Sequence, residues 1–390
     1  MGKLYGPKLS MHLGKKHDYL GVDMEFCDDG ALEVSMFAYL KNIINDFPEL
    51  IKGRAATPAH DKLFVVREES EAKKLSEEQA LAFHHTVAQL LFMATRARRD
   101  IQTAVAFLTT RVKSPDEDDW GKLKRVLKYL NGTKYLKLRL TMDSLGMLKW
   151  YVDGSHNVHW DCRGHGGAVF TLGRGATSSY SRKLKLNTRS STETELVTAD
   201  MFMPEMLWSL HFIQAQGYEV ECVGLYQDKF SSKLLIKNDK MSSGRKTKHI
   251  KAKFFFIKDR VDDGEVKVID CPTEEMWADV MTKPLQGSAF RTMRAELMNC
   301  EVNYEDPAEE DEGSSIPSPK TVSWKKDITS SFKTPQECVG QDKNLLPGRK
   351  TDRRCGRVEH PLGMRRRGLG MARLSAPTWL VGETQGREAR

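Results

Sequence analysis

The order of elements predicted between residues 146 and 297 is the feature that most constrains the fold. Three strand-like apolar runs come first, in the segments MLKWYVDGSH, GGAVFTLGR and ATSSYSRK. A long helical run then begins at TETELV and ends at Gly217, because glycine commonly closes helices. A strand, a helix, a second strand and a closing helix, EEMWADVMTKPL, complete the segment. This order predicts an α/β fold with a mixed sheet flanked by helices.

The sequence on either side has a different character, so we divide the chain at about residues 145 and 298. Residues 1–145 predict a mostly helical segment with one β-hairpin, whose turn is the sequence CDDGA. The helical pattern over 76–112 is expected to split near Arg98–Asp100, and Ser114 is expected to cap a third helix. Residues 298–390 are first acidic and then basic, without apolar periodicity, which predicts a disordered tail.

Composition and charge exclude several classes of protein. The formal net charge is +8, but residues 341–390 alone carry twelve Lys and Arg against five acids, so only local patches elsewhere can indicate nucleic-acid binding. The seven cysteines form no CxxC pair, which argues for reduced thiols and against a structural zinc site. The sequence has neither a run of 18 apolar residues nor an apolar leader near its start. We therefore expect an intracellular protein of the cytoplasm or nucleus, not secreted and without a membrane partner.

Four carboxylates occupy positions that suit a metal site. Asp153 lies in the first strand, Glu195 in the first turn of the long helix, Asp228 at a strand end, and Asp279 near the closing helix. Such a cluster repels itself unless cations fill it, and hard oxygen ligands favour Mg²⁺ or Mn²⁺. Two such ions can clamp a phosphate for in-line cleavage of a nucleic-acid backbone. Glu193 is a rival for the helix position, but the inward side of the helix favours Glu195.

At this point a family resemblance is visible. Residues 146–297 resemble the ribonuclease H domain of copia-type retrotransposon Pol polyproteins, on the motifs WYVDGSH, SRKLKLNTRSSTETELV, LYQD, KTKHI and WADVMTKPLQG. Residues 1–145 are similar to the C-terminal end of the reverse transcriptase of the same polyproteins, on DYLGVDMEF, ATPA and WGKLKRVLKYLNGT. No YVDD-like pair precedes residue 17, so we expect no polymerase palm and no complete reverse transcriptase in this chain.

The resemblance assigns roles to individual residues. It implies that Asp153, Glu195, Asp228 and Asp279 bind the two metal ions, and it places His249 in the KHI signature. His249 is then either a proton shuttle or substrate contact near the scissile phosphate, or a structural histidine. Basic residues that are expected either to contact the hybrid backbone or to be solvated are Lys183, Lys185, Arg189, Lys246 and Lys248.

The function implied is hydrolysis of the RNA strand of RNA–DNA hybrids with two Mg²⁺ (or Mn²⁺) ions, with the strand selected through 2′-hydroxyls and hybrid shape. A separate reverse transcriptase or other polyprotein products are the expected partners. The alternative is a catalytically inactive, truncated retroelement remnant that at most binds nucleic acid. Lys229, next to Asp228, favours this alternative, because its ammonium can compete with a metal ion for the carboxylate.

Overall fold

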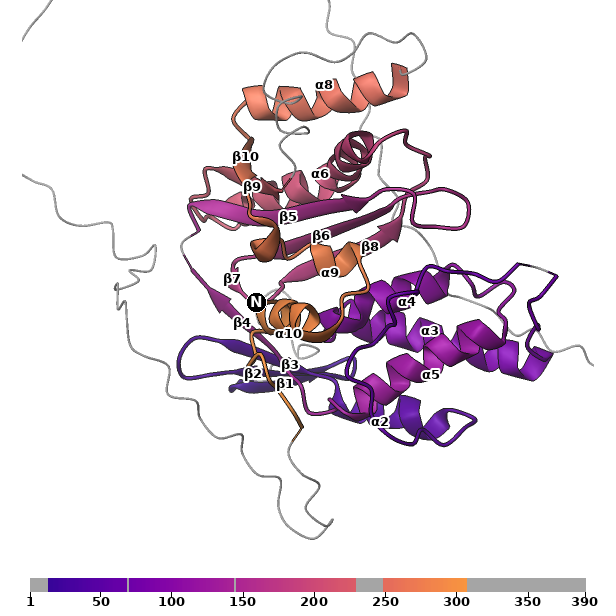
Figure 1. Ribbon diagram of the computed structural model, residues 1–390. Helices are drawn as coiled ribbons and strands as arrows, with labels where there is room; N and C mark the ends of the chain where they lie inside the picture. The colour runs from indigo at the N-terminus through magenta and orange to yellow at the C-terminus, as the bar shows by residue number, and fades with distance from the viewer. Residues whose placement is uncertain (1–12, 69, 144, 229–247, 307–390) are drawn as a thin grey trace, which may run out of the picture. The chain divides into compact units, whose positions relative to one another are not determined.

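The computed structural model describes residues 13–306 except 69, 144 and 229–247, and the side chains of 248–252 are also outside the description. These residues fall within one compact unit, Met1–Ser314. The unit contains two five-stranded sheets with helices beside them (Figure 1). The first sheet is antiparallel throughout and consists, in spatial order, of β1 (Lys16–Tyr19), β2 (Val22–Phe26), β3 (Leu32–Ser35), β4 (Leu138–Met142) and β7 (Gly173–Arg174).

The hairpin predicted around CDDGA is the pair β2 and β3, and its turn places Gly30 at φ +83°. A left-handed conformation of this kind favours glycine. The sequence did not predict β1, which joins β2 through a tight turn, or β4, which pairs with β3 from more than a hundred residues away. Pairing at that distance leaves no local signal, because the partner strand is not adjacent in sequence.

The helices of the first segment agree with the predicted split. They are α2 (Phe37–Asp46), α3 (Glu77–Ala94), the 3₁₀ turn η2 (Arg99–Ile101), α4 (Gln102–Thr109) and α5 (Glu117–Asn131). The prediction that Ser114 caps the third helix was wrong. Asp116 caps α5 instead, since its side chain accepts the backbone N–H of Asp119 at 2.9 Å and Asp119 returns a bond to the Asp116 N–H.

The second sheet confirms the predicted mixed sheet. In spatial order it consists of β10 (Val266–Asp270), β9 (Cys222–Gln227), β5 (Met147–Ser155), β6 (His165–Thr171) and β8 (Ser178–Lys183). Strands β10, β9 and β5 are parallel, while β6 and β8 are antiparallel to their neighbours. Helix α6 (Ser191–Ala215) covers one face, and α8 (Lys248–Asp262) packs against α6 (Figure 1). Helix α9 (Asp279–Thr282) lies on the opposite face.

The single closing helix expected over EEMWADVMTKPL is not formed. The segment contains the 3₁₀ turn η3 (Thr273–Glu275) and the four-residue α9, and a separate helix, α10 (Gly287–Met298), follows. Lys283 is extended, with φ −127° and ψ +135°. Pro284 accounts for this break, because the residue before a proline is driven out of the helical region.

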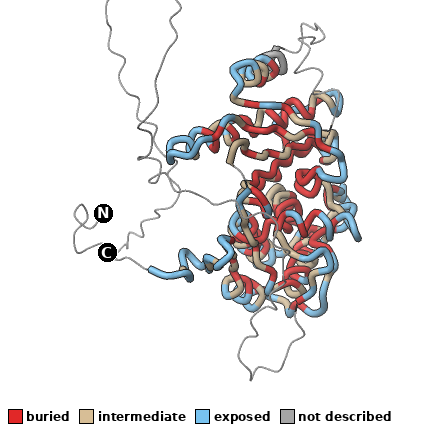
Figure 2. Tube along the Cα trace, turned by 90° about the vertical axis from the view of Figure 1, so that its left-hand side faces the viewer, coloured by how far each residue is buried: buried red, intermediate tan, exposed pale blue. Residues whose placement is uncertain are grey.

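Two main hydrophobic clusters hold the described residues together. Figure 2 shows the buried residues along the chain in red. One lies between the second sheet and helices α6 and α8. The other joins the helices of the first segment with α9, α10 and β6, so packing is continuous across residue 146. The packed chain runs on to Asp306, whose carboxylate accepts the backbone N–H groups of Lys134 and Tyr135 at 2.7 and 3.2 Å. The rest of the tail predicted for 298–390 lies outside the described residues.

No helix within the described ranges is both long and apolar enough to cross a membrane.

Candidate metal centre

Three of the four predicted acids meet at one end of the second sheet. Asp153, Glu195 and Asp228 each offer a carboxylate oxygen, and these oxygens all lie within 4.8 Å of one another. Asp153 comes from β5, Glu195 from just after the first turn of α6, and Asp228 directly follows β9. Asp153 and Glu195 are each 1% exposed, so the charges are withdrawn from water. Three carboxylates this close, two of them this buried, repel each other, which favours a cation between them.

The strand pattern explains why Asp153 and Asp228 are neighbours. Trp150 and Val152 point into the core beneath α6, so the alternating residues Tyr151 and Asp153 face the other way. Strand β5 pairs in parallel with β9, with Tyr151 opposite Tyr226. The same register, continued by two residues, places Asp228 opposite Asp153.

Two glycines let the helices approach the sheet at this point. A Cβ atom on Gly154 would lie 2.7 Å from Thr198 Oγ1 of α6, and a Cβ on Gly167 would lie 2.6 Å from Met281 Cβ of α9. Gly167 is the residue paired with Asp153 across β5 and β6. Any side chain at either position would push a helix outward. Because α6 lies close to the sheet, the Glu195 side chain can reach Asp153 and Asp228.

The geometry also separates the two glutamates that compete for the helix position. Glu193 is partly exposed, and its carboxylate accepts the backbone N–H of Arg189 at 2.8 Å, so it stabilises the start of α6. Glu195 is the glutamate that reaches Asp153 and Asp228.

Asp279 lies beside the three-carboxylate group without joining it. The Lys283 ammonium donates to the Asp279 carboxylate at 2.7 Å and lies 3.7 Å from Asp153 Oδ2, so one cation bridges the two acids. The Thr282 hydroxyl donates to Asp153 as well. Burial and the neighbouring charge of Asp153 raise the pKa of Asp279 to about 6, although Lys283 opposes the shift. The sequence did not single out Lys283, although it follows Asp279 by one helical turn.

The donor set fits Mg²⁺ or Mn²⁺. All candidate ligands are carboxylate oxygens, with no Cys or His among them, as hard cations prefer. Asp228 Oδ1 is buried and has no hydrogen-bond partner among the described residues. A buried carboxylate oxygen without a donor is costly, and coordination to a cation would satisfy it.

Comparison with known proteins identifies the relatives of the chain. It is 31% identical over 215 residues to the retrovirus-related Pol polyprotein from transposon TNT 1-94 of Nicotiana tabacum. Over 218 residues it is 29% identical to the corresponding polyprotein from transposon RE2 of Arabidopsis thaliana. The chain is homologous to copia-type retrotransposon Pol polyproteins. The two alignments cover 53% and 54% of this chain but only 16% and 14% of the relatives. No family model matches the chain.

Solved structures show a weaker likeness. LC11-RNase H1, isolated from compost by a metagenomic approach, is 17% identical, with 35% of this chain and 92% of that chain covered and a TM-score of 0.27. The foamy viral protease-reverse transcriptase, solved in complex with dsDNA, is 10% identical, with coverages of 67% and 46% and a TM-score of 0.36.

The basic residues predicted in this Pol-related chain differ in their surroundings. Lys183 is held by an ion pair to Asp161 at 2.8 Å, and its ammonium lies 3.6 Å from the centre of the Trp160 ring. Lys185 and Arg189 are exposed. Three further residues cannot be placed: the side chains of Lys248 and His249 at the start of α8, and Lys246, lie outside the described residues, as does Lys229.

A buried histidine pair near the acids was not predicted. His159 Nε2 lies 2.9 Å from His165 Nδ1, His165 Nε2 lies 2.7 Å from Ser181 Oγ, and the Ser181 hydroxyl donates to the Met281 carbonyl of α9. Since Ser181 donates onward, it must accept from His165, which in turn must accept from His159. This chain of bonds therefore requires the His165 imidazole to be neutral, with its proton on Nε2, and it fixes α9 against β8.

Acid should destabilise the protein through this pair. Burial lowers the pKa of His159 to about 4 and that of His165 to about 3, with Lys183 and His159 adding to the respective shifts. An unfolded histidine titrates near about 6.5, so below that pH the unfolded state binds more protons and the free energy of unfolding falls. His159 alone should lower the free energy of unfolding by about 3 kcal/mol between pH 7 and pH 4. Urea unfolding at pH 7 and pH 4.5 would measure this.

The matched comparison for the pH effect is between His159→Gln and His85→Gln, since His85 is exposed on α3. The first variant should lose part of the pH dependence of stability, and the second should keep it. Equal pH dependence in the two variants would contradict the assignment.

Proposed function

We propose that this chain is a ribonuclease H-type endonuclease that hydrolyses the RNA strand of RNA–DNA hybrids with two Mg²⁺ or Mn²⁺ ions. The observation that carries the proposal is the group of three carboxylates within 4.8 Å, two of them almost fully buried. Their order along the fold, in a central strand, a helix start and a neighbouring strand end, supports the same function, as does homology to Pol polyproteins. A separate reverse transcriptase or other polyprotein products would supply the hybrid.

The acids and their neighbours would have different roles in such a reaction. When bound, the two ions would activate the attacking water and stabilise the leaving 3′ oxygen. Asp153, Glu195 and Asp228 would hold the ions through their carboxylate oxygens. Asp279 would join as the fourth ligand once its bond to Lys283 is released. Thr282 orients the Asp153 carboxylate through its hydroxyl.

The deciding experiment is cleavage of a labelled RNA–DNA hybrid by the purified full chain, with Mg²⁺, with Mn²⁺ and with EDTA. Metal-dependent cleavage of the RNA strand alone supports the proposal. A folded chain that leaves the hybrid intact in every metal is the inactive remnant, and the proposal then fails. Duplex DNA and single-stranded RNA serve as substrates that should survive.

Lys283 should control how much metal the site requires. Its ammonium bridges Asp153 and Asp279 at 3.7 and 2.7 Å, so it competes with a cation for both carboxylates. Repulsion between an ammonium and a nearby dication is about 1–4 kcal/mol at effective dielectrics between bulk water and a protein surface. Lys283→Met should therefore tighten Mg²⁺ binding by about fivefold or more. Calorimetric titration of the substrate-free protein measures this affinity.

Lys267→Met is the matched control, because Lys267 is an exposed residue of β10, which is an edge strand of the second sheet. The control should leave Mg²⁺ affinity unchanged. Weaker Mg²⁺ binding in Lys283→Met than in the parent protein would show that the lysine assists the metal site.

A further inference from the structure

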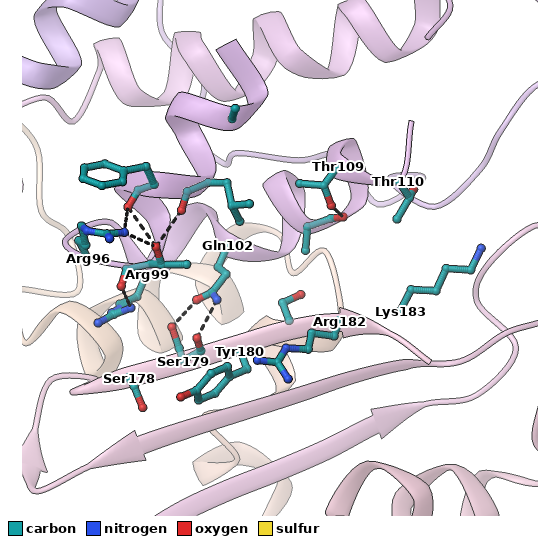
Figure 3. Close-up of a pocket in the computed structure, with 16 residues that line it drawn as sticks. Arg96, Arg99, Gln102, Thr109, Thr110, Ser178, Ser179, Tyr180, Arg182 and Lys183 are labelled. Atoms are coloured by element: carbon teal, nitrogen blue, oxygen red, sulfur yellow. Dashed lines mark hydrogen bonds between the residues drawn. The ribbon is translucent and has the colours of Figure 1, made fainter. Parts of the chain in front are cut away.

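A basic groove runs along the outer edge of the second sheet, outside the metal centre. It has a volume of about 850 Å³ and lies between helices α3 and α4 on one side and the edge strand β8 on the other. Figure 3 shows Arg96 and Arg99 on the helical side, with Arg182 and Lys183 on the strand. Both walls are fixed to each other, since the Gln102 amide of α4 donates to the Ser179 carbonyl at 2.7 Å. The groove is therefore a preformed feature of the fold.

Positive charge dominates this groove. Four cationic side chains line it, and no acid is among its described lining residues. Arg99 is only 7% exposed, and its guanidinium donates to the carbonyls of Thr95 and Thr177 rather than to a described carboxylate. Its Nε atom is buried without a partner. A buried guanidinium is normally paired with an acid. Because the Arg99 guanidinium donates to neutral carbonyls, no described acid balances its positive charge, and it can attract an anion.

The other lining groups suit a phosphate backbone. Arg96 stacks on the Phe92 ring, with its guanidinium carbon 3.7 Å from the ring centre, and it is exposed. Arg182 is exposed and lies over the Tyr180 ring, with Glu205 as a partner at 3.1 Å. Serine and threonine hydroxyls fill the positions between these cations. Arginine, lysine and hydroxyl groups are the side chains that most often contact phosphate oxygens.

The register of the sheet connects this groove to the metal centre. Asp153 pairs with Gly167, and Gly167 pairs with Ser181 in the wall of the groove. Two strand spacings, about 10 Å, therefore separate the backbone at Asp153 from the groove. Ser155 is linked in the same way, through His165, to Lys183. The groove thus ends at the same end of the sheet as the acids.

We infer that this groove binds the sugar–phosphate backbone of a nucleic acid and leads it to the metal centre. The inference rests on the proposed function for the identity of the polyanion. The free edge of β8 could instead pair with an extended acidic peptide. Nucleic acid is favoured because the groove ends beside carboxylates suited to phosphodiester chemistry, and a peptide would gain nothing from that position.

The test is the salt dependence of binding to a 20-base-pair RNA–DNA hybrid in EDTA, which prevents cleavage. Arg96→Gln/Arg182→Gln changes two exposed cations of the groove. Each lost phosphate contact reduces the magnitude of the slope of log K against log salt by roughly 0.7–0.9, so losing two contacts should reduce it by roughly 1.4–1.8. The control, Lys41→Gln/Arg291→Gln, removes the same charge from exposed sites on α2 and α10.

A slope in the groove variant that matches the control would overturn the inference. The inference would also be overturned if the groove variant bound a poly-glutamate peptide more weakly than the control but bound the hybrid equally well. The groove would then be a peptide-binding site. Because binding is measured without metal, a chain that fails to cleave can still satisfy this test. Conversely, cleavage that survives with an unchanged salt slope would keep the proposed function and reject the groove.

Discussion

Asp153→Asn should reduce metal-dependent hybrid cleavage by more than about 100-fold, because even groups behind metal ligands contribute 10- to 100-fold to metal affinity or activity. Asp153 is 1% exposed and is the acid that contacts every other part of the site: Glu195 and Asp228 by proximity, Thr282 by a hydrogen bond and Lys283 by charge. Asparagine keeps the shape but removes the charge that holds a dication. Single-turnover cleavage at saturating Mg²⁺ measures the loss.

The fold should survive this change. Removing one of three close carboxylates relieves repulsion, so the melting temperature of the metal-free variant should equal or exceed that of the parent. Mg²⁺ should raise the melting temperature of the parent and not of the variant, since only a ligand of the folded state stabilises it. Asp143→Asn, at an exposed position before β5, is the matched control. Retained cleavage in Asp153→Asn would remove this residue from the metal site.

Local pattern was enough to predict two of the acids that cluster at one end of the second sheet. The period-two alternation around Trp150 and Val152 determines which way Asp153 points. The helical phase that favoured Glu195 over Glu193 agrees with the burial found in the structure. Both inferences depend on neighbours within a few residues, and burial of an apolar face fixes such a register strongly.

Contacts between distant segments could not be predicted in this way. Lys283 was overlooked because its closeness to Asp153 depends on α9 packing against β5 and β6, which no local pattern records. The groove was overlooked for the same reason, since Arg99 and Arg182 are neighbours only after α4 docks on β8. Lys229 was singled out by sequence adjacency to an acid. Among the described residues, the cation that bridges two acids at the metal centre is Lys283, 130 residues from Asp153.

A stability effect as large as the catalytic one is expected beneath the groove, at the junction between α3 and α4. Arg98 and Asp100 are 3% and 0% exposed at their side chains and form a two-pronged ion pair at 3.0 and 2.7 Å. Thr133 accepts from Arg98 at 2.8 Å, and the Tyr129 hydroxyl donates to Asp100 at 2.6 Å. Burial acts to raise the pKa of Asp100, but Arg98 and Tyr129 keep it below its ordinary value.

Asp100→Leu should therefore lower the free energy of unfolding by about 3–5 kcal/mol, because it leaves a buried guanidinium without its counter-charge. Arg98→Met should do the same for the carboxylate. The double variant should lose less than the two single losses together, since replacing a whole buried pair by apolar groups is often nearly neutral. Urea unfolding of the four proteins measures this coupling. The exposed pair Lys73 and Glu117, 3.8 Å apart, provides the parallel cycle.

That exposed pair should show a coupling of only about 0.2–1 kcal/mol, because water screens both charges. Equal coupling energies in the two cycles would mean that the buried pair contributes no more to stability than a surface ion pair does. Full additivity at Arg98 and Asp100 would show that each is held by its other partners. A large coupling would show that the Arg98–Asp100 pair stabilises the junction between α3 and α4, the two helices of the groove wall. Loss of the pair should then weaken hybrid binding, because Arg96 and Arg99 would be held less firmly even though neither is changed.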